Sequence, residues 1–155
     1  MIQLDKIDCD ILSALQQEGR ISILDLAERV GLSATPCARR VKHLEDEGVI
    51  ERYAAVLNPR VLGQHLDVFV NVRLRSSTTK AIEIFERAID SMPEVVECYL
   101  VTGNYDYLVH IRVADIDEFK SYVRERLSGI ASVGETVSSI ALEQTKRTTS
   151  IALPS

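Results

Sequence analysis

The spacing of apolar residues changes along the chain, from a helical period in the first 48 residues to a period of two after residue 66. In the first part, apolar side chains recur every three or four positions over residues 5–18, and glycines stand at positions 19, 31 and 48. This spacing predicts amphipathic helices, and glycine readily ends a helix in a left-handed conformation. We therefore predict three helices, with Gly19 left-handed after the first and Ser22 and Ser33 as N-caps of the other two.

The third predicted helix has one apolar face and one face rich in basic and hydroxyl groups. At about 100° per residue, Cys37, Val41 and Leu44 share the apolar side. Two helices joined by a short turn containing glycine are typical of a helix-turn-helix. No acidic residue occurs from Arg29 to His43, although the chain carries a net charge of −5. A short positive stretch on an acidic protein favours a localised contact with DNA phosphates, and an ordinary three-helix subdomain is the alternative that spacing leaves open.

The second part of the chain alternates strands and helices. The expected elements are a strand over residues 66–75, a helix over 79–91, strands over 94–102 and 105–113, a helix from Asp115 to near Gly129 and a strand over 133–144. Gly103-Asn104 is expected to form a two-residue hairpin turn between the middle strands. The order β-α-β-β-α-β predicts an α+β fold of the ferredoxin-like type, with four antiparallel strands and both helices on one face.

Apolar residues occupy both faces of the second and third predicted strands. Val96 and Leu100 fall on one face of the second strand, and Tyr99 and Val101 fall on the other. Strands that are apolar on both faces are usually buried on both. Because the two helices can cover only one face, we expect a second copy of the chain to cover the other, in an obligate dimer.

These patterns predict the domain boundaries. We expect a DNA-binding domain over residues 1–48 with its helix-turn-helix at about 22–47, a strand and connector over 49–65, a ferredoxin-like effector-binding and oligomerisation domain over 66–147, and a tail over 148–155. Cys9, Cys37 and Cys98 have neither the number nor the spacing of a disulfide framework or metal site. With no apolar run of membrane length and no apolar signal core, we expect a reduced, metal-free cytoplasmic protein without membrane contact.

Several runs resemble the Lrp/AsnC (feast/famine) family of transcription regulators, and its leucine-responsive branch in particular. The runs are Leu4-Asp5-Lys6-Ile7-Asp8, Gly19-Arg20-Ile21-Ser22, residues 30–37, residues 39–45, Leu57-Asn58-Pro59 and residues 97–107. They span essentially the whole chain in order. The resemblance implies a winged helix-turn-helix that binds double-stranded DNA in the bacterial nucleoid, and a ferredoxin-like domain that forms homodimers and octamers. It also implies an amino-acid effector, leucine or another apolar amino acid, at the interface of C-terminal domains, with no other cofactor.

The resemblance also implies which residues bind. Those expected to contact DNA are Ser33, Thr35, Pro36, Arg39, Arg40, Lys42 and His43. Those expected to hold the effector are Tyr99, Val101, Thr102, Gly103, Asn104, Tyr105, Asp106 and Tyr107. Asp106 would accept from the ammonium group, backbone N–H groups near Gly103 would bind the carboxylate, and the tyrosines would wall the side chain. The residues by themselves leave a simpler interpretation open, an ordinary turn with Asp106 satisfying nearby N–H groups.

Two other functions have to be weighed. Relatives of the same architecture that decarboxylate siroheme make an enzyme one alternative, and a DNA-binding architectural protein without an effector is the other. Catalysis needs an acid, base or nucleophile in a constellation, but His43, His65 and His110 lie on three separate predicted elements. Since no phosphate loop or metal motif accompanies them, we expect a regulator without catalytic residues.

Overall fold

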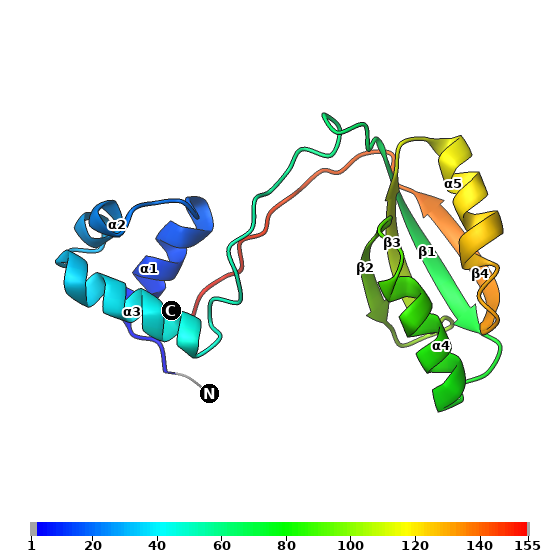
Figure 1. Cartoon of the computed structure of the whole chain (residues 1–155), viewed down its shortest axis with the longest axis horizontal. Helices are drawn as coiled ribbons and strands as arrows, with labels where there is room; N and C mark the ends of the chain where they lie inside the picture. The colour runs from blue at the N-terminus through cyan, green and yellow to red at the C-terminus, as the bar shows by residue number, and fades with distance from the viewer. Residues whose placement is uncertain (1–2, 155) are drawn as a thin grey trace. The chain divides into compact units, whose positions relative to one another are not determined.

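The computed structural model describes residues 3–154, which form two compact units. One unit takes the chain up to Val56 together with the segment from Lys146 onward, and the other is Leu57–Thr145 (Figure 1). Residues 146–154 thus belong to the N-terminal unit, although the sequence suggested only a tail from residue 148. Among the described residues, no helix has the length and apolar character needed to cross a membrane.

The first unit contains the three expected helices, α1 (Lys6–Gln17), α2 (Ile23–Arg29) and α3 (Ala34–Asp46). Ser22 caps α2, since its hydroxyl accepts from the Asp25 amide at 3.1 Å. Ser33 occupies the N-cap of α3 with extended backbone, but its side chain makes no capping hydrogen bond.

The glycine expectation is right at two helix ends and wrong at the first. Gly31 and Gly48 have φ angles of +70° and +69°, the left-handed region that glycine tolerates best. Gly19 is not left-handed, because Glu18 has already left the helix with φ −139°. The Ile21 amide then donates to the Glu18 carbonyl at 3.1 Å, so the turn forms without a left-handed residue.

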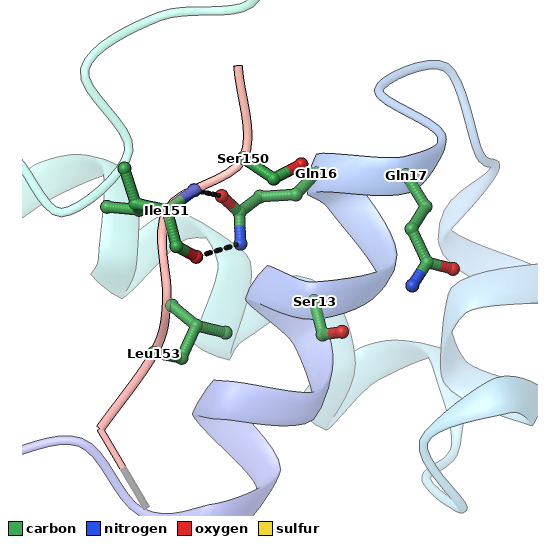
Figure 2. Close-up of a pocket in the computed structure, with 6 residues that line it drawn as sticks. All are labelled: Ser13, Gln16, Gln17, Ser150, Ile151 and Leu153. Carbon is green, nitrogen blue, oxygen red and sulfur yellow. Dashed lines mark hydrogen bonds between the residues drawn. The ribbon is translucent and has the colours of Figure 1, made fainter. Parts of the chain in front are cut away.

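The C-terminal segment of the chain packs against the core of the first unit. Ile11, Leu26 and Leu44, one from each helix, are almost completely buried, and Leu153 packs against their cluster. The Gln16 side chain of α1 binds the main chain of Ile151 twice. Its amide nitrogen donates to the Ile151 carbonyl at 3.1 Å, and its oxygen accepts from the Ile151 amide at 2.7 Å (Figure 2). The C-terminal segment is therefore a structural part of the helical unit.

The segment after α3 departs from expectation. The prediction of a strand within residues 49–65 is wrong, because none of the described residues before Leu66 lies in a strand. A strand needs a hydrogen-bonded neighbour, and the sheet of this chain begins only at β1. A turn follows Asn58, whose side chain accepts from the Arg60 amide at 3.1 Å.

The second unit has the expected element order. Its elements are β1 (Leu66–Leu74), α4 (Thr79–Asp90), β2 (Val95–Leu100), β3 (Tyr107–Val113), α5 (Ile116–Tyr122) with a π-helical continuation η1 (Val123–Leu127), and β4 (Val133–Ile140). The strands lie in the order β2-β3-β1-β4 and every neighbouring pair is antiparallel. This confirms the α+β, ferredoxin-like prediction. The last strand is four residues shorter than expected.

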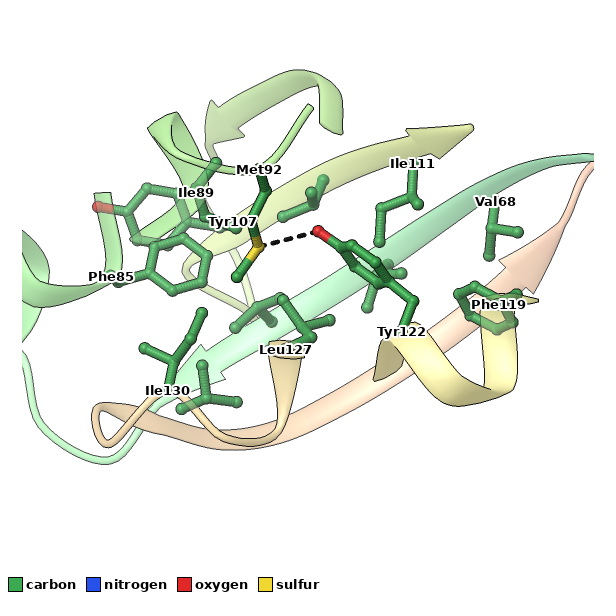
Figure 3. Packing of buried hydrophobic residues seen from close by; sticks show 14 of the residues in the cluster. Val68, Phe85, Ile89, Met92, Tyr107, Ile111, Phe119, Tyr122, Leu127 and Ile130 are labelled. Carbon is green, nitrogen blue, oxygen red and sulfur yellow. Dashed lines mark hydrogen bonds between the residues drawn. The ribbon is translucent and has the colours of Figure 1, made fainter. Parts of the chain in front are cut away.

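One face of this sheet packs on the helices. Val68, Val70 and Val72 of β1 are fully buried against a cluster that includes Phe85 of α4 and Tyr122 of α5 (Figure 3). Alternation with a period of two places the remaining residues of β1 on the opposite face. That face, which we call the open face, carries the apolar side chains of Phe69 on β1, Tyr99 on β2, Leu108 on β3 and Val137 on β4. Phe69, Tyr99 and Val137 are between 37% and 51% exposed.

Candidate functional site

The outward face of α3 is exposed and carries most of the residues expected to contact DNA. Cys37, Val41 and Leu44 point into the core of the first unit, so the opposite side of the helix faces outward. The expected contact residues that are exposed to solvent are Ser33, Thr35, Arg39, Lys42 and His43, and Pro36 is half-buried. One helix thus presents a cationic, hydroxyl-bearing surface of the kind that enters a DNA groove.

The first turn of α3 suits a phosphate oxygen. Ser33 leaves its hydroxyl out of capping, and no acidic residue lies in that turn. Amide N–H groups at the start of a helix have no partner within the helix, and the helix dipole favours an anion there.

Arg40 is oriented differently from the other six residues. Its Nη1 lies 2.7 Å from Asp5 Oδ2 and 2.7 Å from Asp8 Oδ1, both on the first turn of α1. The Asp8 amide and the Arg40 guanidinium hold the pKa of Asp5 below its ordinary value. In this structure the cation is therefore engaged within the protein.

The loop between β2 and β3 is longer than the two-residue turn expected from the sequence. It spans residues 101–106, and the Val101 amide donates to the Asp106 carbonyl at 2.9 Å. Gly103 has φ +119°, whereas Asn104 stays at negative φ, so the common turn with two left-handed residues cannot form. The prediction of that turn was wrong because the strands end earlier than their apolar residues do.

Main-chain and side-chain contacts fasten this loop to β1, among them a hydrogen bond of 2.9 Å from the Asp106 amide to the Val72 carbonyl. The Asp106 carboxylate accepts from the Leu74 amide at 2.7 Å, at the irregularity where β1 ends. Arg73 donates from Nε to the Asn104 carbonyl at 2.8 Å, and its guanidinium lies over the Tyr105 ring, 5.2 Å from the ring centre. The loop is therefore held in place before any ligand arrives, and one oxygen of Asp106 is already used.

The tyrosines expected around an effector lie on both faces of the sheet. Tyr107 is buried on the helix side, where its hydroxyl donates to Glu86 at 2.9 Å and its ring packs on Phe85. Burial and the Glu86 contact raise the pKa of Tyr107 to about 12. Tyr99 pairs with Leu108 and is half exposed on the open face. The structure thus brings together residues 101–106, but not Tyr99 with Tyr107.

Sequence reasoning missed a polar cluster on the open face. His110 is 7% exposed, lies 2.7 Å from Asp67 through Nε2, and stacks on Phe69 with ring centres 4.6 Å apart. Arg112 donates to the same Asp67 oxygen at 2.8 Å. Burial raises the pKa of Asp67, but the hydrogen bonds from His110 and Arg112 outweigh this effect and lower it overall. Only the alternation along β1 and β3 could have indicated this cluster.

Family comparisons agree with both units. Residues 4–51 match the model of a winged helix-turn-helix DNA-binding domain, and residues 67–151 match that of the Lrp/AsnC ligand binding domain. A DNA-binding domain joined to a ligand-binding domain is the usual architecture of a ligand-responsive transcription regulator. The chain belongs to the Lrp/AsnC family of DNA-binding transcription regulators, which carry an amino-acid-binding domain.

Relatives match over nearly the full length. A proline dehydrogenase transcriptional activator of Rhizobium radiobacter is 41% identical over 94% of this chain and 93% of its own. The leucine-responsive regulatory protein of Escherichia coli is 39% identical over 97% of this chain and 92% of its own. A crystal structure of a Neisseria meningitidis transcriptional regulator in complex with L-Met is 39% identical, with a TM-score of 0.94 and 97% coverage of both chains.

Proposed function

We propose that the chain regulates transcription by placing α3 on double-stranded DNA, and that an apolar amino acid bound by the C-terminal domains changes DNA affinity or assembly. The observation that carries the first half is the exposed face of α3, which combines Arg39, Lys42 and His43 with the unused hydroxyl of Ser33. Thr35 and Pro36 complete the proposed contact surface. Lys and Arg can bind phosphates or guanine edges, and hydroxyls suit phosphate oxygens.

DNA binding is tested by fluorescence anisotropy on duplexes selected from random sequence. We expect Arg39→Ala to weaken binding by about 5–150-fold, the effect of losing one good arginine contact. The matched control is Arg87→Ala, which removes an equal charge from an exposed position on α4. Equal effects of the two substitutions would contradict the proposed surface.

The effector half rests on the loop at residues 101–106. Its main chain is exposed at Gly103 and already fixed by Arg73, so N–H groups there could bind a carboxylate without a large ordering cost. Asp106 would pair with the ammonium group through the carboxylate oxygen that Leu74 does not use, and Val101, Thr102, Asn104 and Tyr105 would surround the ligand. Tyr99 would contact the ligand from the open face. Tyr107 would not contact it and would support the loop from the helix side of the sheet. Leucine and methionine are the amino acids we favour.

The carboxylate of Asp106 can be tested apart from its structural contact. Asp106→Asn keeps an oxygen that can accept from the Leu74 amide but removes the charge, whereas Asp106→Ala removes both. We expect calorimetry to show that both variants lose amino-acid affinity, while only Asp106→Ala also disturbs the loop. Full affinity in Asp106→Asn would show that the ammonium group binds elsewhere.

A second copy of the chain would cover the open face and complete the effector site, and dimers would join further into octamers. Tyr99 and Val137 support this assembly, because both leave apolar surface exposed on the open face. Exposed apolar surface of this kind often marks an interface with another protein chain. We expect light scattering to report a dimer or a multiple of it, and Val137→Glu to reduce its mass. Ile84→Glu, on the helix side and similarly exposed (39% against 42% for Val137), is the control.

We place this activity in the cytoplasm, at the nucleoid, because the protein is proposed to bind DNA, and we propose no catalytic role. His110 supports this view, because it is held by Asp67 and stacked under Phe69 and not beside a nucleophile. An architectural DNA-binding protein would bind DNA in the same way but would show no response to any amino acid.

A further inference from the structure

The start of α1 contains a closed group of two acids and one cation. Asp5 and Asp8 cap α1 reciprocally, since Asp5 Oδ1 accepts from the Asp8 amide at 2.8 Å and Asp8 Oδ2 accepts from the Asp5 amide at 3.1 Å. The other oxygen of each carboxylate lies 2.7 Å from Nη1 of Arg40. All four carboxylate oxygens are therefore used, two for the cap and two for the arginine.

This group joins α3 to α1 beside the apolar core of the first unit. Cys37, Val41 and Leu44 hold one face of α3, and Arg40 stands at the flank between that face and the exposed Arg39. The Asp8 side chain is 14% exposed and that of Arg40 is 33% exposed, so the contact is partly shielded from water. Charge-assisted hydrogen bonds are directional, so in this setting they add a geometric restraint on the rotation of α3 to the one that apolar packing provides.

We propose that Arg40 is a positioning residue, which acts through Asp5 and Asp8 to set the rotation of α3, and that it does not bind DNA. The cation offsets the charge of two acids that would otherwise repel each other across the α1 cap. Arg39, its neighbour in sequence, projects from the same helix without that restraint. This inference rests on the proposed function, because it assigns a role within DNA reading by α3.

The two roles can be separated by salt dependence. Losing a phosphate contact lowers the slope of log Kd against log salt concentration by about one, because fewer counterions are released. We expect Lys42→Ala, which removes a cation from the same exposed face of α3, to show that reduction. Arg40→Ala should weaken binding by about tenfold and leave the slope unchanged, since no phosphate contact is lost.

A double variant of the acids gives the decisive result. Asp5→Asn with Asp8→Asn keeps one oxygen in each side chain to cap α1 and turns an NH₂ group toward Arg40. Removing two negative charges should strengthen binding to a polyanion if the acids act only through bulk charge. We expect the opposite, a loss of affinity similar to that of Arg40→Ala, with circular dichroism showing that the helices remain folded.

Each outcome decides between the roles. Unchanged or tighter DNA binding by the double variant, or a slope lowered by about one in Arg40→Ala, would overturn the positioning role. Failure of the proposed function looks different, because Arg39→Ala would then be without effect as well. Unfolding of the double variant would also contradict the inference, because the retained capping oxygens should preserve α1.

Discussion

Leu153 offers a direct test of the finding that the C-terminal segment belongs to the helical unit. Full burial of a leucine side chain is worth about 1.5–3 kcal/mol, and Leu153 is half-buried in the cluster with Leu26 and Ile11. We therefore expect Leu153→Ala to destabilise the first unit by about 1–2 kcal/mol. The hydrogen bonds between the Gln16 side chain and the Ile151 main chain should persist, because they do not involve the side chain of Leu153.

Hydrogen exchange can follow each unit separately, which a single melting curve cannot do for a chain of two units. We expect amides in α1 to exchange about 5–30-fold faster in Leu153→Ala, while those in β1 keep their rates. Ile151→Ala is the matched control, because that side chain is 74% exposed and its loss should change stability by about 0.5 kcal/mol at most. If exchange in α1 does not change, or if both variants behave alike, the segment does not stabilise the helical unit.

Two further predictions follow from the pKa shifts. Because the folded protein lowers the pKa of Asp67, this carboxylate stabilises the second unit above the unfolded pKa of about 4, and its contribution is lost as the pH falls through the folded value. The free energy of unfolding of the second unit, measured with denaturant, should therefore fall from pH 5 to pH 3 in the wild type and fall less in Asp67→Asn. Equal pH dependence in the two proteins would contradict the stabilising role of the Asp67 carboxylate. Burial and Glu86 raise the pKa of Cys98 to about 11, so we expect iodoacetamide at pH 8 to label it roughly 20-fold more slowly than a free cysteine. Labelling at the rate of a free cysteine would show that this environment is wrong.

The elements were predictable because their signals are local. The alternation from Leu66 to Leu74 marked β1, and the buried stripe on α3 followed from its period of 3.6. These patterns state which face of an element is buried, and that determined the fold class and the exposed position of Arg39. The family resemblance then supplied Tyr99 and residues 101–107 as a candidate effector site.

What the sequence could not show depends on contacts between distant residues. Arg40 and Asp8 are 32 positions apart, and Gln16 and Ile151 are 135 apart, so no local period connects them. Likewise, the engagement of Asp106 with Leu74 depends on where β1 ends, which alternation locates only approximately. Residue type and helical position place a side chain on a face, but they do not identify its partner.

The most direct test of the central claim measures DNA affinity with and without an amino acid. Thermal-shift screening of the twenty amino acids first identifies the one that stabilises the chain most. Anisotropy on a selected duplex, at one fixed salt concentration, then gives Kd in its presence and absence. If the chain is a DNA-binding regulator that responds to an amino acid, the Kd for DNA should change by about 5–150-fold. If no amino acid stabilises the chain, and neither Kd nor the oligomeric mass changes with any of them, the account of an amino-acid-responsive regulator is contradicted.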